Sequence, residues 1–218
     1  FKINKKFHIK DLVLDSNIVL KELSILNKFN FKTIFPKIEQ NIKLNDHKIK
    51  FSYDQNIFQI SGIGKILLQQ NNDELSYSIK KEKKNYDFKS NITITENPFL
   101  ISLINFKKKK NSKMTINING SKNLDNMIKL NLISLRENEN KLSISNLILN
   151  EKFKIIDLKG VKVDYIDQEN IKNQFNIKKN NNTYHLNGSS LNVNKLVDNL
   201  INNDEKSNII KKNFKLDI

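Results

Sequence analysis

The chain has 218 residues, including 37 Lys, 37 Asn and 32 Ile, and a formal charge of +15. The absence of Cys excludes disulfides and thiol chemistry. Arg136 is the only arginine, and the lysines are spread over strands and turns, so we expect no specific nucleic-acid partner, because base readout depends on arginine forks. No stretch is apolar over the length needed to span a bilayer.

From the N-terminus onward, apolar and polar residues alternate in short runs. This period of two places apolar side chains on one face of a strand and polar side chains on the other. It predicts sheet with one apolar and one polar face. The runs are Ile49-Phe51-Tyr53, Leu75-Tyr77-Ile79, Ile92-Ile94, Met114-Ile116-Ile118, Ile128-Leu130-Leu132 and Val161-Val163-Tyr165.

Clusters of Asn and Asp separate these runs about every 8 to 15 residues, the spacing of antiparallel meanders. Both residues tolerate left-handed backbone angles and can replace Gly in hairpins. The chain has two Pro and five Gly, and no Pro- or Gly-rich linker. We therefore predict an all-β fold: an elongated, curved, mostly antiparallel sheet, trough-like in shape, with one or two short helices.

Two segments break the alternation. Residues 27–41 mix periods and contain Pro36, which fits a short helix or a loop. Residues 194–203 place Leu196, Val197, Leu200 and Ile201 on one helical face, with Asn194 as the expected N-cap. A last strand is expected at Phe214–Ile218.

Residues 9–23 align without gaps on residues 144–158, at a shift of 135 residues. Leu12 matches Leu147, Leu14 matches Leu149, and Ile18 matches Phe153. The match reflects either an internal strand–turn–strand repeat or chance in a biased composition.

The sequence offers no catalytic or metal constellation. His8, His47 and His185 lack the spacing of metal ligands. Asp164, Asp167 and Glu169 are near in sequence but need not converge in a cleft. Gly62 and Gly64 lack the third glycine and the helix of a dinucleotide fingerprint and fit a bulge or bend within a strand. We expect no enzyme, no cofactor, no metal and no small-molecule substrate.

Three longer runs carry a family resemblance. YHLNGSSLNVNKLVDNLI (residues 184–201) combines a strand, a glycine, a short strand and an amphipathic turn of helix. IKDLVLDSNIVLKELSI (9–25) and LSISNLILNEKFKIIDLKGVKVDY (142–165) share an L-x-x-L-x-L pattern followed by a turn and a strand. Together they resemble AsmA-like repeat proteins of the YhdP and TamB type, bridge-like lipid transfer proteins of the Gram-negative envelope.

The resemblance implies that residues 1–218 are one segment of a larger protein in the periplasm, anchored in the inner membrane by a region outside this chain. It implies that phospholipid acyl chains move between the inner and outer membranes along an apolar groove. The alternative is a structural or adhesive β-sandwich or β-solenoid with a closed core and no ligand. The residues we expect to line the groove lie on central strands, where plain core is the competing interpretation: Ile92, Ile94, Met114, Ile116, Ile118, Leu130 and Leu132.

Overall fold

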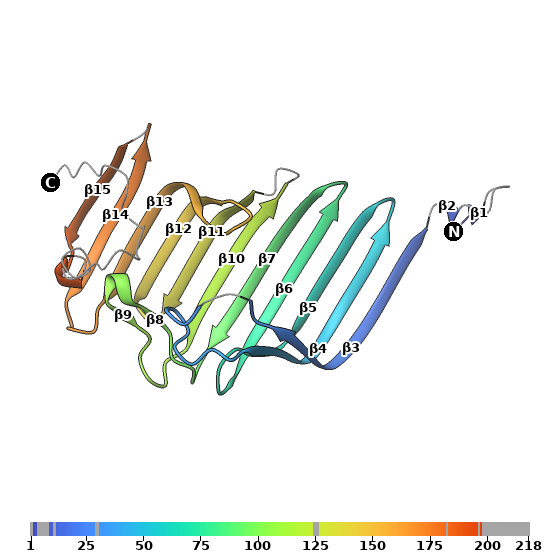
Figure 1. The fold of residues 1–218 in the computed structure, drawn as a ribbon, viewed down its shortest axis with the longest axis horizontal. Helices are drawn as coiled ribbons and strands as arrows, with labels where there is room; N and C mark the ends of the chain where they lie inside the picture. The colour runs from blue at the N-terminus through green and yellow to red at the C-terminus, as the bar shows by residue number, and fades with distance from the viewer. Residues whose placement is uncertain are drawn as a thin grey trace.

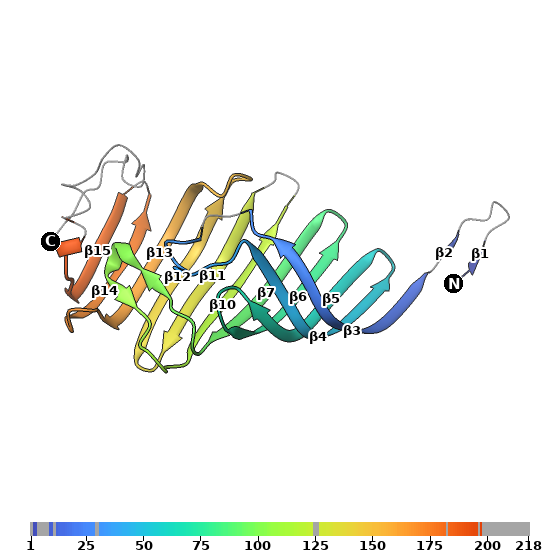
Figure 2. The ribbon, with the colours of Figure 1, turned by 60° about the horizontal axis from the view of Figure 1, so that its bottom comes forward.

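One large antiparallel sheet dominates the structure, a computed structural model that describes residues 2–3, 9–10, 12–28, 31–123, 127–181, 183–195 and 197. The sheet has eleven strands and does not close into a barrel (Figure 1). It bends around one face, which we call the inner face (Figure 2). The predicted all-β, elongated and antiparallel fold is therefore confirmed.

The strands follow chain order across the sheet except for one excursion between β7 and β10. From one edge to the other the strands are β3 (Val13–Leu26), β4 (Asn41–Asp54), β5 (Ile57–Leu67), β6 (Asn72–Glu82), β7 (Asn85–Ile94), β10 (Met114–Lys122), β11 (Ile128–Glu137), β12 (Asn140–Leu149), β13 (Ile155–Ile166), β14 (Lys172–Asn180) and β15 (Thr183–Ser190). Two small hairpins lie outside the sheet: β1 (Lys2–Ile3) with β2 (Ile9–Lys10), and β8 (Leu100–Ile101) with β9 (Phe106–Lys107).

The turns between strands use asparagine rather than glycine. Asn56, Asn138 and Asn181 have positive φ angles of 69°, 51° and 53°, whereas no glycine in the described ranges does. Asn tolerates this left-handed conformation better than most residues. The predicted role of Asn clusters as hairpin turns is thus confirmed at these positions.

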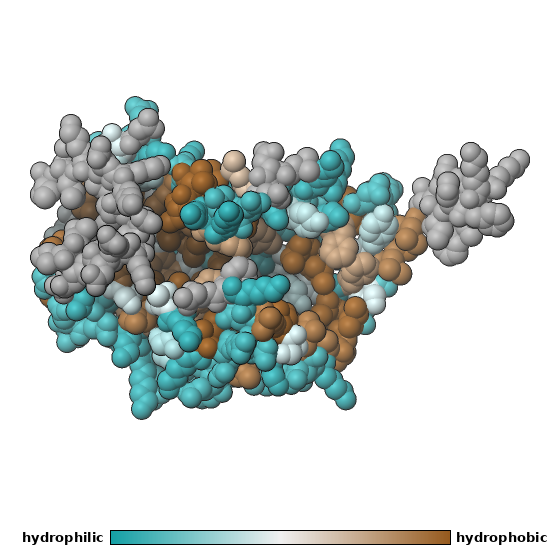
Figure 3. All heavy atoms as spheres, viewed as in Figure 1, coloured by the Kyte–Doolittle hydropathy of each residue, from teal (hydrophilic) through white to brown (hydrophobic). Residues whose placement is uncertain are grey.

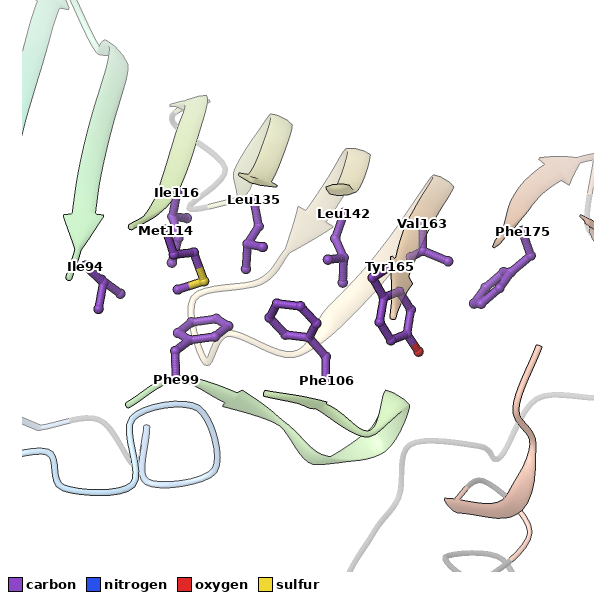
Figure 4. Packing of buried hydrophobic residues seen from close by; sticks show 10 residues of the cluster. All are labelled: Ile94, Phe99, Phe106, Met114, Ile116, Leu135, Leu142, Val163, Tyr165 and Phe175. Atoms are coloured by element: carbon purple, nitrogen blue, oxygen red, sulfur yellow. The ribbon is translucent and has the colours of Figure 1, made fainter. Parts of the chain in front are cut away.

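The excursion between β7 and β10 folds beneath the inner face and closes a hydrophobic core (Figure 4). Residues 97–112 carry β8, the 3₁₀ turn η1 (Ser102–Ile104) and β9. Phe106 is fully buried, with its ring centroid 6.4 Å from that of Phe99 and 5.7 Å from that of Tyr165, both edge-on. The covered region is the cluster of Ile94, Phe99, Phe106, Met114, Ile116, Leu135, Leu142, Val163, Tyr165 and Phe175.

A second connection, residues 31–40, joins this cover as a loop of turns, which resolves the helix-or-loop alternative for residues 27–41. Ile34 and Phe35 pack against the covered region, and the Phe35 ring lies 5.5 Å from the Phe99 ring. The Leu100 amide donates to the Ile34 carbonyl at 3.0 Å, so the two covering segments are joined to each other.

A β-bulge in β11 reverses the facing of its side chains. Leu132 pairs with Asn119, but Leu130 pairs with Gly120, which leaves Asn131 as an extra residue. Directly paired residues of antiparallel strands share a face. Leu130 therefore shares the inner face with Gly120, whereas Leu132 lies on the outer face with Asn119.

The aligned runs 9–23 and 144–158 do not share one structure. From Val13 onward the first run lies within the uninterrupted strand β3. The second run ends β12, turns at residues 150–154 and begins β13. The two runs therefore do not form a strand–turn–strand unit that is used twice.

The helix predicted at 194–203 begins as expected, with Asn194, Lys195 and Val197 helical and the Val197 amide bonded to the Val193 carbonyl at 2.9 Å. Its start is capped differently, because the Asn192 side chain accepts from the Asn194 amide at 3.1 Å. Asn194 is already inside the helix and is not the cap. Residues 196 and 198–203 and the predicted strand 214–218 lie outside the described residues.

Candidate functional site

Over most of its length the inner face of β3 to β6 is not sealed by the covering segments, and we call it the open region; only its end at His47, Ile66 and Asp73 is buried. Its side chains are half-buried or exposed: Ile18 and Leu14 are 46% and 47% exposed, and Phe51, Phe58, Ile60 and Ile79 are half-buried. In Figure 3, apolar residues gather in a band along the middle of the view, between hydrophilic residues above and below. This exposed apolar area is the feature of the molecule that a stable globular core does not explain.

Strand register arranges the inner face into apolar rows that cross the strands, because each paired residue continues the row on the next strand. We count the rows from the rim, the end of the inner face beside the β4–β5 and β6–β7 turns. The second row contains Ser16, Phe51, Ile60, Ile79, Phe88, Gly120, Leu130, Leu147 and Leu158. The third row contains Ile18, Ile49, Gly62, Tyr77, Ser90, Ile118, Ile133, Ile144, Val161, Ile177 and Leu186. Apolar surface therefore continues from the open region onto the strands of the covered region.

Two glycines of β5 make room for rings that lie on this face. A Cβ on Gly62 would stand 2.4 Å from Tyr77 Cζ, and one on Gly64 would stand 2.4 Å from His47 Cδ2. The two rings lie 5.8 Å apart. The predicted bend or bulge is placed instead in β4, where the register shifts between Asn45 and Lys48, and Gly62 and Gly64 provide space for side chains.

His47 is the most enclosed of the histidines that the structure describes. It is fully buried, its Nε2 lies 2.9 Å from the Lys65 carbonyl, and its Nδ1 has no partner. His185 lies on β15, far along the sheet, and His8 lies outside the described residues. Within the described ranges no three His, Cys, Asp or Glu residues gather as metal ligands.

The seven residues predicted to line the groove fall into different environments. Ile94, Met114 and Ile116 are buried in the covered region, so the prediction that they line an open groove is wrong. The reason is residues 97–112, which fold onto them. Ile92 and Ile118 pack partly buried against that cluster.

The other two predicted lining residues are on β11. Leu130 lies in the second row, half-buried and on the inner face, so it stays a candidate lining residue. Leu132 is on the outer face and 37% exposed, so its assignment to the groove is wrong, because the bulge at Asn131 shifts the alternation by one residue.

Sequence reasoning missed the apolar residues of the open region, of which Phe51, Ile60 and Ile79 belong to the second row. Phe88 on β7 continues this row beyond the open region. The signal that separates the two regions is the run FLISLINF at 99–106. Its apolar residues do not alternate, and a run without alternation between two alternating strands indicates a segment covered on more than one side. It marks where the inner face becomes core.

Buried polar residues fix the covering segment to the sheet. Glu137 is fully buried and accepts from the Lys109 amide at 2.6 Å and from Asn140 Nδ2 at 3.1 Å. Lys108, also buried, donates through Nζ to the carbonyls of Thr95 and Lys109. Burial lowers the pKa of Lys108, which the charges of Glu137 and Asp73 partly offset.

Asp73 lies at the same end of the sheet and is 2% exposed. Asn97 Nδ2 donates to its Oδ2 at 2.8 Å, while Oδ1 is buried without a partner. Burial raises the pKa of Asp73 to about 6, against the lowering effect of the Asn97 hydrogen bond. These groups hold the cover in place at the buried end of the inner face, where Asp73 pairs with Ile66.

The carboxylates singled out in the sequence do not converge on one cleft. Asp164 is ion-paired with Lys172 and bonded to Gln174 on the outer face. Asp167 is buried in a turn, where it accepts from Asn173 and Asn192 side chains at 3.2 and 2.8 Å. Burial opposes the lowering of the pKa of Asp167, which its hydrogen bonds from Asn192, Asn173 and backbone amides produce together. These are structural turn contacts.

Two shallow hollows of about 810 and 950 Å³ lie across β3 to β7 and β10. Each lining combines two neighbouring rows of outer-face residues with the single inner-face row between them, so outer-face side chains form the walls and the strand backbone forms the floor. The wall that the hollows share is polar: Asn17, Lys50, Ser61, Ser78, Lys89 and Asn119. They are features of the outer face and are separate from the apolar rows.

Within the described ranges no helix has the length and apolar character to cross a membrane. Comparisons with protein-family models, with curated proteins and with solved structures gave no match to this chain.

Proposed function

We propose that this chain is a segment of a periplasmic, inner-membrane-anchored lipid conduit, in which phospholipid acyl chains move between the two membranes along the inner face of the sheet. The observation that carries the proposal is the open region. There the apolar rows of the inner face lie uncovered on a single sheet layer and continue across neighbouring strands. The proposal needs no catalytic residue, cofactor or small-molecule substrate.

Elementary energetics support this use of an exposed apolar face. Each methylene kept out of water contributes about 0.8 kcal/mol, so a continuous apolar row lowers the free-energy cost of an acyl chain outside a bilayer. The second and third rows of the lining are mainly aliphatic and aromatic, with single serines and glycines and no charged residue. Such a surface binds acyl chains without fixing their position, which favours movement along it.

Site-specific photocrosslinking in cells tests the proposal. A photoreactive residue replaces Ile60 or Ile79 on the inner face, with matched positions Ser61 and Ser78 on the outer face of the same strands. We expect phospholipid adducts at the first pair, detected by mass spectrometry of the purified protein, and none at the second. Equal labelling of both faces, or no lipid at either inner position, contradicts the conduit.

A scaffold without ligand is the second candidate, and the edge strand β3 favours it. Within the described residues β3 pairs on one side only, and it exposes apolar side chains on both faces, including Val19 at 74%. Long apolar edge strands pair readily with a further strand. Protein adducts at Val19 together with no lipid adducts at Ile60 and Ile79 would support the scaffold.

A further inference from the structure

The rim of the inner face carries an isolated basic site. The first row, at the rim, lies two residues along each strand from the second row. Its directly paired residues are Leu14, Tyr53, Phe58, Lys81, Tyr86, Lys122, Ile128 and Leu149. Lys81 and Lys122 are its only charged members, and both pair directly with Tyr86, which lies between them on β7. The rest of the row is aliphatic or aromatic.

The acidic side chains that the structure describes leave the positive charge at this site unneutralised. In the part of the chain that the structure describes, neither Lys81 nor Lys122 has an ion-pair partner. The neighbouring acid Glu82 is instead paired with Lys80 at 2.9 Å. Lys83 and Lys84 form the turn beside Lys81 and add to the positive potential there.

Tyr86 holds one of the two ammonium groups on the inner face. Lys81 Nζ lies over the Tyr86 ring, 5.4 Å from its centroid, within the range of a cation–π interaction. Tyr86 is 38% exposed as a residue, so this arrangement is open to solvent and to a ligand. The lysine is thereby directed along the inner face.

Apolar surface lies one step inside the site. On the same three strands the second row contributes Ile79, Phe88 and Gly120, each about 6.5 Å along its strand from the rim residue of the site. The Phe88 ring lies over Gly120, where a Cβ would stand 2.8 Å from Phe88 Cζ. A positive rim beside an apolar floor matches the two ends of one amphipathic molecule.

We propose that Lys81, Tyr86 and Lys122 bind the phosphate of an anionic phospholipid whose acyl chains lie on Ile79, Phe88 and the rows beyond. This inference rests on the proposed conduit and adds a headgroup preference to it. Charge selects the ligand, because two unpaired ammonium groups attract a net negative headgroup more strongly than a zwitterionic one.

The test measures lipid that co-purifies with the full chain after incubation with vesicles of phosphatidylglycerol or of phosphatidylcholine. We expect the chain to retain about tenfold more phosphatidylglycerol, from roughly two lysine contacts. The Lys81→Gln/Lys122→Gln double variant should retain both lipids equally. The matched Lys50→Gln/Lys89→Gln variant removes the same charge from the exposed outer face and should keep the preference.

Three outcomes separate the two levels of the proposal. Retention of neither lipid by the unmodified chain overturns the conduit itself. Retention of both lipids equally, or equal loss of preference in the two double variants, overturns the headgroup site while leaving the conduit standing.

Discussion

The covered and open regions share one sheet and one alternating pattern, yet only the first is a hydrophobic core. In the covered region, residues 97–112 and 31–40 place Phe99, Phe106, Ile34 and Phe35 on the inner face. In the open region, strands β3 to β6 carry equally apolar inner-face residues with no such layer. The difference teaches that alternation determines which side chains face inward, while the connections between strands determine whether that face is sealed.

A single-layer sheet is stable only where another segment covers its apolar face, or where neighbouring strands half-bury enough of its apolar side chains. We therefore expect the covered region to contribute most of the stability and the open region to be free for binding. The four predictions below test that division.

The largest effect is expected from Phe106→Ala. Phe106 is fully buried between Phe99 and Tyr165, so its removal leaves a cavity and should cost about 3–5 kcal/mol of unfolding free energy. Phe58→Ala in the open region removes a half-buried ring that contacts Phe51 and should cost about 1 kcal/mol. Urea denaturation of both variants measures the difference. Equal losses would show that the two regions are not energetically distinct.

The next effect concerns pH and Asp73. Its pKa is about 6 in the folded chain and near 3.8 when unfolded, so the folded state binds the proton more tightly. Stability from this group is therefore fully present below about pH 4 and falls as pH rises towards 6, by up to about 3 kcal/mol. Asp73→Asn should remove this decline.

Urea midpoints of wild type and Asp73→Asn between pH 4 and pH 7 measure the effect as the difference between the two proteins, which cancels the other carboxylates. The gap in favour of the variant should widen with pH. A constant gap would mean that Asp73 is ionised throughout and that its burial is compensated by Lys108.

A smaller effect separates two glycines of the open region. In Gly64→Ala the new Cβ would stand 2.8 Å from the backbone Cα of His47, which cannot move aside, and we expect a loss of about 2 kcal/mol. In Gly62→Ala the clash is with the Tyr77 ring only, which can swing away over the uncovered face at a cost of about 1 kcal/mol. Thermal unfolding gives both values. A larger loss for Gly62→Ala would mean that Tyr77 is held in place and that the face above it is filled.

The smallest effect tests the bulge in β11. Leu132→Asn alters an exposed side chain of the outer face and should change stability by less than about 0.5 kcal/mol. Leu130→Asn, two residues away on the inner face, should cost about 1–2 kcal/mol. Chemical denaturation compares them. The reverse order would place the register shift elsewhere.

Strand positions and turns followed well from the sequence, because both depend on local rules. Period-two runs such as Leu75-Tyr77-Ile79 became strands, and clusters such as Asn138-Glu139-Asn140 became hairpin turns with a left-handed Asn. The facing of Leu132 did not follow. Leu130 and Leu132 are both apolar, so the alternating pattern gives no sign that Asn131 is an extra residue. Only the pairing of β11 with β10 reveals it.

Even less of the candidate site could be predicted from the sequence, because which residues are covered and which are open depends on contacts between residues far apart in sequence. Ile116 and Ile79 belong to similar alternating runs, but only Ile116 meets the segment that follows β7. The basic rim was equally hidden. Lys81 and Lys122 are separated by 41 positions (122 − 81) and come to the same face through β7.

The strand count has a geometric consequence for assembly. Because eleven is odd and every neighbour is antiparallel, β3 and β15 run in the same direction. Copies arranged in tandem, with β15 of one beside β3 of the next, would meet at a parallel seam with a different hydrogen-bonding ladder. Copies related at β3 by a twofold axis perpendicular to the sheet would instead keep every ladder antiparallel. The odd number of strands therefore distinguishes assemblies that keep the antiparallel hydrogen-bonding pattern of this sheet from assemblies that interrupt it with a parallel pair.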